Sequence, residues 1–195
     1  MASFSSPAIH AVVEVAIREE CVWSAPPERP WPEFVRLWHA TSGAHVSLVV
    51  GTLSSYGAEA KSSEQLVEEF PDVLPGGLAV VTSDVEIMPS CCCGLEHWRE
   101  WEQVLATGQS PWTGHDPAPL VERTRDGVLV WSDGGMGPKP SERPIAFTTE
   151  EFSKALRDAT NDLHEFLHPL QQWLEVHTPE QASKIVDLFK GTFLG

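Results

Sequence analysis

A long apolar stripe near the C-terminus is the feature that most restricts how this chain can fold. Apolar side chains recur there every three or four residues, which is the spacing that places them on one face of an α-helix. Thr148 and Glu151 form a capping box ahead of the stripe, and Phe147 and Phe152 are spaced as a hydrophobic staple. The sequence therefore predicts a long amphipathic helix over 149–176. Its buried face comprises Phe152, Leu156, Ala159, Leu163, Phe166, Leu167, Leu170 and Leu174.

The part of the chain that precedes this helix favours short strands. Apolar residues alternate with others from Ala8 to Trp23, a pattern that is typical of a half-buried strand. The pair Asp126-Gly127 predicts a tight hairpin turn, because such pairs readily supply positive φ values. Further strands are predicted at 45–53, 78–81, 85–88, 120–124 and 128–131, and further helices at 34–38, 62–70, 95–105 and 178–190.

This order of elements predicts an α+β fold, with a mostly antiparallel sheet packed against the long C-terminal helix. A chain of 195 residues has the length of one domain. We therefore expect a single domain over 1–195. The segment 132–144 is dense in proline and glycine, so we expect a mobile loop there.

The strongly negative net charge of the chain limits the kinds of molecule that it can bind. The 28 acidic residues exceed the 13 lysines and arginines, which gives a formal net charge of −15 and a pI near 4.8. Such a surface repels phosphate backbones and anionic lipid, so we expect neither a nucleic acid nor a membrane as partner. The chain has no apolar run of membrane-spanning length, and its first residues lack the basic segment of a signal peptide. We therefore expect a soluble, cytoplasmic protein that requires no cofactor.

The segment His164-Glu165-Phe166-Leu167-His168 matches the H-E-x-x-H signature of zinc proteases. In that signature two histidines on one helical face bind zinc, while the glutamate activates a water molecule. The apolar stripe of the predicted helix is centred near Leu163, which places His164 and His168 at its polar edge and Glu165 opposite the core. We therefore interpret this segment as a solvated helix face, with zinc-dependent hydrolysis as the alternative.

Three consecutive cysteines, Cys91, Cys92 and Cys93, stand shortly before His97 and a predicted helix. Soft ligands at such a position can bind a metal or carry out redox chemistry. Successive side chains of an extended segment point to alternating sides, so at most two of the three thiols are expected to converge. The competing interpretation is that these cysteines act as small apolar side chains at a strand-to-helix junction.

The stretch from Leu37 to Trp98 is strongly acidic. It holds eight acidic residues and one lysine, which amounts to a charge of −7. This stretch is either an ordinary solvated surface or a docking face for a basic protein. In the second case, exposed tryptophans would anchor the partner. The partner-binding residues predicted on this basis are Glu68, Glu69, Trp98, Trp101, Trp112 and Asp116.

In general character the chain resembles the immunity proteins of bacterial toxin systems, which are small, acidic and cytoplasmic. The resemblance implies an inhibitor that masks the active site of a toxin, often a basic nuclease, and that is not itself an enzyme. Two alternatives from other classes remain. One is a zinc-dependent hydrolase that uses residues 164–168, and the other is a cysteine-based metal-binding module.

Overall fold

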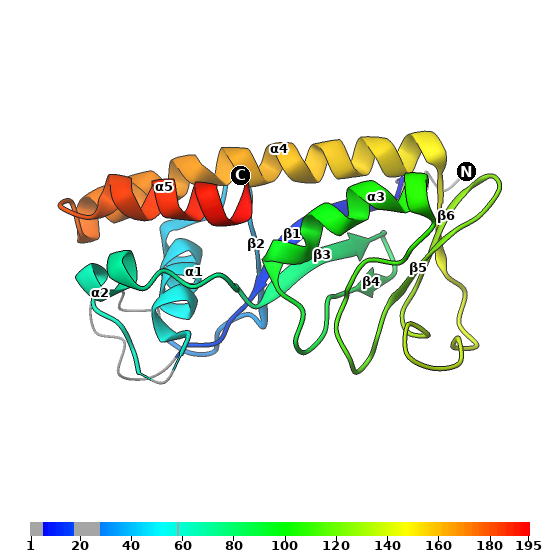
Figure 1. The fold of residues 1–195 in the computed structure, drawn as a ribbon, viewed down its shortest axis with the longest axis horizontal. Helices are drawn as coiled ribbons and strands as arrows, with labels where there is room; N and C mark the ends of the chain where they lie inside the picture. The colour runs from blue at the N-terminus through cyan, green and yellow to red at the C-terminus, as the bar shows by residue number, and fades with distance from the viewer. Residues whose placement is uncertain (1–5, 18–27, 58) are drawn as a thin grey trace. The chain divides into compact units, whose positions relative to one another are not determined.

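The computed structural model describes residues 6–17, 28–57 and 59–195. It divides into two compact units, each assembled from segments that are distant in sequence. Unit 1 comprises residues 6–11 and Gly76–Asn161, and unit 2 comprises Val12–Pro75 and Asp162–Gly195. Figure 1 follows the chain through its elements. The α+β class and its antiparallel sheets are confirmed. The single domain over 1–195 stays a prediction.

The first strand, β1 (Ala8–Glu14), contributes residues to both units. It pairs antiparallel with β2 (Phe34–Arg36) in a sheet whose order is β2-β1-β3-β4. Within unit 1, β3 (Gly76–Val81) and β4 (Glu86–Ile87) form an antiparallel pair, which confirms the strands expected there. The expected strand over 8–23 is thus shorter than predicted. Its last six residues lie outside the described residues.

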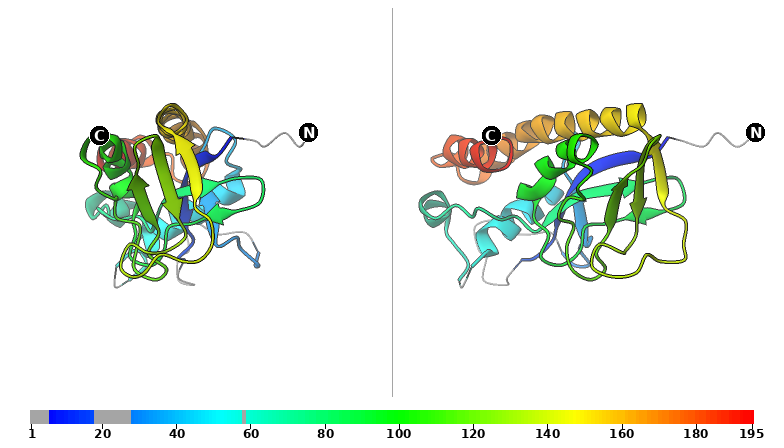
Figure 2. Two further views of the ribbon diagram at one scale, coloured as in Figure 1. Left: turned by 90° about the vertical axis from the view of Figure 1, so that its right-hand side faces the viewer. Right: turned by 45° about the vertical axis from the view of Figure 1, so that its right-hand side comes forward.

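A second sheet in unit 1 has the order β5-β6-β7 (Figure 2). The hairpin of β5 (Leu120–Arg123) and β6 (Gly127–Trp131) is confirmed, and β7 (Ile145–Thr148) adds a strand that was not predicted. The reason given for Gly127 was wrong, because this residue is not among those with positive φ. A Cβ at Gly127 would instead collide with the Phe147 carbonyl oxygen. Close approach of β7 therefore requires glycine.

The segment 132–144 connects β6 to β7 as a loop. The Asp133 carboxylate accepts hydrogen bonds from the Ala118 and Gly134 backbone N–H groups at 3.0 and 2.7 Å. Lys139 lies 2.7 Å from the Glu122 carboxylate. These contacts attach the loop to β5 and the residues before it. Its mobility stays a prediction.

The long helix, α4 (Thr149–His177), is confirmed almost to the residue. The Thr148 hydroxyl accepts a hydrogen bond from the Glu151 N–H at 3.2 Å, and the Glu151 carboxylate accepts one from the Thr148 N–H at 2.9 Å. Phe152 contacts the ring of Phe147 in β7, as the staple requires. It also stacks on Trp101 of α3 (Glu100–Thr107). These contacts hold the first part of α4 within unit 1.

The helix predicted over 95–105 is present in two parts. A 3-10 helix, η1 (Leu95–Arg99), leads directly into α3. Gly108 ends α3 with a φ of 74°, a left-handed conformation that glycine adopts without steric cost. This glycine therefore ends the helix.

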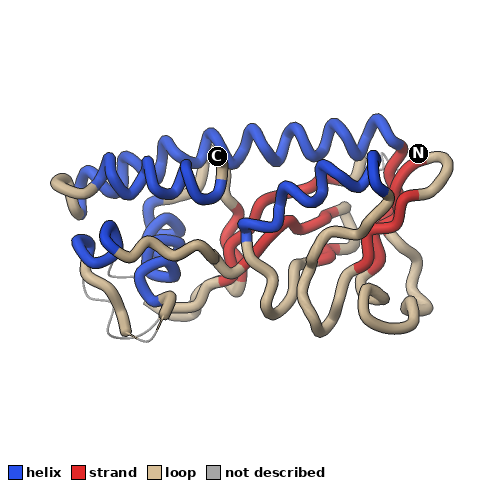
Figure 3. Tube along the Cα trace, in the orientation of Figure 1, coloured by secondary structure: helices blue, strands red, loops and turns tan. Residues whose placement is uncertain are grey.

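Unit 2 is mainly helical (Figure 3). It contains α1 (Gly43–Ser55), α2 (Ser63–Glu68), the second part of α4 and α5 (Ala182–Phe193). Phe189 of α5 contacts both Phe166 of α4 and Phe193 in the core of this unit. The helix expected over 62–70 is present as α2 and begins with a capping box: the Ser62 hydroxyl accepts a hydrogen bond from the Gln65 N–H, and the Gln65 side chain accepts one from the Ser62 N–H.

The strand predicted over 45–53 is wrong, because these residues form helix α1. Ser42 caps the helix by accepting a hydrogen bond from the His45 N–H at 3.3 Å. Every residue from Val46 to Ser55 is buried. A helix that is buried on all sides carries no polar stripe, so its apolar run has the same appearance as that of a buried strand.

Two further predictions need correction. The helix expected over 34–38 is replaced by strand β2, whose Val35 pairs with Val13 of β1. The last helix, which was expected over 178–190, begins at Ala182 and continues to Phe193. Residues 178–181 form a turn instead, in which the Gln181 N–H donates to the Thr178 carbonyl oxygen.

Candidate functional site

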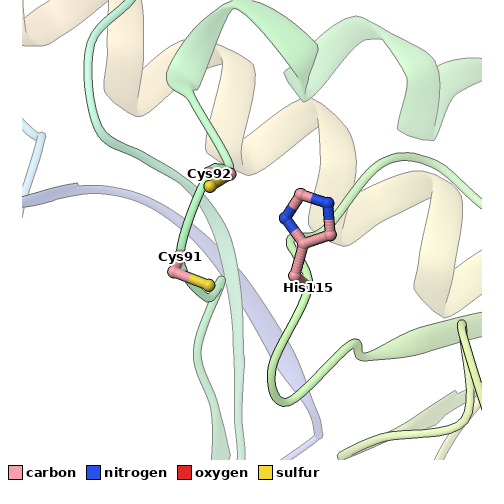
Figure 4. A group of neighbouring side chains, drawn as sticks. All are labelled: Cys91, Cys92 and His115. Atoms are coloured by element: carbon pink, nitrogen blue, oxygen red, sulfur yellow. The ribbon is translucent and has the colours of Figure 1, made fainter.

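Two distant segments of unit 1 bring three potential metal ligands together. The thiols of Cys91 and Cys92 and one ring nitrogen of His115 all lie within 4.8 Å of one another. All three side chains are exposed. Figure 4 shows the two thiols and the imidazole grouped between the turn at 91–92 and the loop that carries His115. We call this group the Cys2His cluster.

Backbone hydrogen bonds hold the two segments of the cluster side by side. The Ser90 N–H donates to the Thr113 carbonyl oxygen at 2.9 Å, and the His115 N–H donates to the Cys91 carbonyl oxygen at 3.2 Å. The Trp112 indole N–H donates to the Cys92 carbonyl oxygen at 2.8 Å. These hydrogen bonds therefore fix the backbone positions from which the three Cys2His side chains extend.

Two unusual backbone positions allow this approach. Cys92 has a φ of 65°, in the left-handed region that residues other than glycine seldom adopt. This conformation breaks the alternation of an extended chain, so two consecutive thiols can face the same ligand group. Gly114 has a φ of 108°, and a Cβ there would lie 2.7 Å from the Ser90 carbonyl oxygen. The loop can therefore approach the cysteines only with glycine at this position.

Cys93 is separate from the cluster although it is the next residue. It is 5% exposed, and its thiol donates to the Trp112 carbonyl oxygen at 3.6 Å. Burial, with a smaller contribution from the negative charges of Glu96 and Glu100, raises the pKa of the Cys93 thiol to about 12. This cysteine therefore stays protonated. The interpretation of cysteine as an apolar filler holds for Cys93 and fails for Cys91 and Cys92.

His97, the histidine proposed as a ligand on sequence grounds, is not part of the cluster. Its ring nitrogens lie 3.5 Å from the Glu96 carboxylate and 2.8 Å from the Glu100 carboxylate. Glu100 also accepts a hydrogen bond from the Trp112 N–H at 2.7 Å. Through Glu100, His97 thus helps to connect the 3-10 helix to the loop that contains Trp112. His115, and not His97, is the histidine that lies beside Cys91 and Cys92.

The H-E-x-x-H segment lies on α4, and His164, Glu165 and His168 are exposed, as predicted. The Glu165 carboxylate lies 3.2 Å from His39 Nδ1. Within the described ranges, the groups of three or more close ligand atoms include neither His164 nor His168. The helix continues past Pro169 to His177.

A second group of potential ligands, His39, Asp162 and Glu165, lies in unit 2. Asp162 accepts a hydrogen bond from the Arg36 guanidinium at 2.7 Å. His39 and Glu165 are already close enough to form an ion pair when the imidazole is protonated. The positive charge of Arg36 disfavours a cation at this position. The group is better explained as a network of ion pairs on the surface of unit 2.

The predicted partner-binding residues divide into two sets. Glu68, Glu69 and Asp116 are exposed, and Trp112 is half-buried. Trp98 and Trp101 are each 3% exposed, so they present no face to a partner. Their assignment as anchors is corrected, because both indoles complete the core of unit 1.

Comparisons of the chain with family models, curated proteins and solved structures find no match. Within the described residues, none of the helices combines the length and the apolar character that crossing a membrane requires.

Proposed function

We propose that the chain is an acidic protein-binding protein of the immunity type, which inhibits a basic toxin or enzyme by covering its active site. The docking surface that we propose is residues 59–72 of unit 2, which we call the acidic segment. This segment surrounds helix α2 with five acidic residues, and all of them are exposed: Glu59, Glu64, Glu68, Glu69 and Asp72.

The observation that carries the proposal is the position of Lys61, the one basic residue in this segment. Its side chain is only 16% exposed. Its ammonium group donates to the Glu69 carbonyl oxygen at 2.7 Å and lies 3.9 Å from the Glu69 carboxylate. The acidic segment therefore presents mainly carboxylates to an approaching partner, because the side chain of its lysine is mostly buried.

One carboxylate of the segment is further biased toward its charged form. Hydrogen bonds from its own backbone N–H and from the Ser62 hydroxyl lower the pKa of Glu64 below its ordinary value. Exposed carboxylates increase the rate at which a basic partner associates. Trp112 in unit 1 remains a second candidate contact, because its ring is partly exposed.

Charge reversal tests the docking surface. Glu68→Lys with Glu69→Lys changes the charge of the acidic segment, and Asp126→Lys with Glu142→Lys makes the same change in exposed loops of unit 1. We expect a basic partner captured by the wild-type protein to associate about tenfold more slowly with the first variant at low salt, and to be much less affected by the second. Raising the salt concentration should slow wild-type association.

The inhibitory role needs a separate readout. Cells that express the captured partner alone should stop growing, and co-expression of the wild-type chain should restore growth. The charge-reversed acidic segment should restore growth less well than the control variant does. The proposed docking surface is contradicted if the captured partner is acidic, or if its association rate does not change with salt concentration. The immunity role is contradicted if expression of the partner alone does not stop growth.

A further inference from the structure

We propose that the Cys2His cluster is a zinc site with three protein ligands and one coordination position left for water or a further ligand. Cys91, Cys92 and His115 supply the two sulfurs and the nitrogen. This inference does not depend on the proposed function, because the cluster lies in unit 1 and the acidic segment lies in unit 2.

The ligand types select a thiophilic cation. Thiolate sulfur and imidazole nitrogen are the usual ligands of zinc, whereas calcium and magnesium require oxygen ligands. Two thiolates and a neutral imidazole would balance the charge of one Zn²⁺ ion. The binding step releases the two thiol protons to solvent, and it forms two Zn–S bonds and one Zn–N bond without any change in oxidation state.

The observed distances are compatible with this coordination. Zn–S bonds of about 2.3 Å in a tetrahedral site place two sulfur atoms roughly 3.8 Å apart. The three ligand atoms already lie within 4.8 Å of one another. Because the side chains of Cys91 and Cys92 are exposed, rotations about their χ angles can bring the two thiols closer to the His115 nitrogen.

The framework behind the ligands limits their freedom before a metal arrives. The bond from the His115 N–H to the Cys91 carbonyl oxygen joins the two ligand segments directly. The Trp112 ring packs edge-on against the His115 imidazole, with 4.8 Å between ring centroids, and its N–H donates to the Cys92 carbonyl oxygen. Trp112 thus contacts both ligand segments, which makes it a positioning residue for the cluster.

Metal titration of the reduced, chelator-treated full chain tests the site. Co²⁺ replaces Zn²⁺ as the coloured probe, and we expect thiolate-to-cobalt charge-transfer absorption that saturates at one equivalent and that Zn²⁺ abolishes. Cys91→Ser and His115→Gln should each weaken binding at least tenfold. Two control variants should bind as the wild type does: Cys93→Ser, which removes the adjacent buried thiol, and His168→Gln, which removes an exposed imidazole outside the cluster.

Thiol alkylation gives a readout that needs no variant. With mass-spectrometric mapping, we expect Zn²⁺ to protect Cys91 and Cys92 from iodoacetamide, while Cys93 stays unlabelled with or without the metal because it is buried. The assignment is overturned if the reduced chain gives no charge-transfer band, if labelling ignores Zn²⁺, or if the ligand variants bind as tightly as the wild type. Uptake of Cu⁺ without Zn²⁺ or Co²⁺ also overturns it, as does a Cys91–Cys92 disulfide in a protein whose reduced form takes up no metal.

Discussion

Leu163→Ala is the sharpest test of how α4 packs in unit 2. Leu163 is fully buried, and its neighbours on the same helix face, Ala159 and Phe166, are 1% and 0% exposed. Truncation removes three carbon atoms, which costs about 2.4 kcal/mol in lost burial at about 0.8 kcal/mol each. The cavity left among rigid neighbours adds to this cost, so we expect a total loss of about 2–5 kcal/mol in the free energy of unfolding.

The matched control is the adjacent residue. His164 is exposed at the polar edge of the apolar stripe, so His164→Ala should change the free energy of unfolding by no more than about 0.5 kcal/mol. Differential scanning calorimetry measures both variants, and for a chain of this length we expect Leu163→Ala to lower the melting temperature by about 5–15 °C. Equal melting temperatures for the two variants would refute the packing of α4 described here.

Four other predictions concern caps and glycines. Thr148→Ala removes the N-cap of α4 and should destabilise the protein by about 1 kcal/mol in urea unfolding. Hydrogen bonds from the Thr148 backbone N–H and from the Thr148 hydroxyl lower the pKa of Glu151. The stability that these bonds provide is therefore present above the ordinary pKa of 4.5, and it is lost as the pH falls through the lowered value. Glu151→Gln should make the free energy of unfolding depend less on pH in this acidic range. Gly127→Ala should cost about 2 kcal/mol or more, because its Cβ would collide with Phe147. Gly191→Ala, with open space at its Cβ, should leave the protein equally stable or raise its melting temperature.

Local signals in the sequence were sufficient for the elements that depend on neighbouring residues. The capping box and staple of α4 involve residues within five positions of one another, and all of their predicted contacts are present. The capping box of α2 and the hairpin of β5 and β6 are of the same kind. Such contacts form wherever the local chain adopts its preferred conformation.

Elements that depend on burial were harder to predict. The apolar run of α1 lacks a polar face because unit 2 surrounds it, so periodicity could not distinguish this helix from a strand. The start signal for α1, Ser42, is a single hydroxyl without the partner glutamate or glutamine of a capping box. Likewise, β2 is only three residues long and exists through its pairing with β1.

The three adjacent cysteines explain why the candidate site could be predicted only in part. The residue types indicated a metal, and the alternation of an extended chain indicated that two thiols at most would converge. The left-handed turn at Cys92 decides which two they are, and no feature of the sequence marks it. The third ligand, His115, follows 23 positions after Cys92 and is brought close by hydrogen bonds between two loops. Three identical neighbours thus take two different roles, because their chemistry depends on the backbone conformation and burial that distant residues impose.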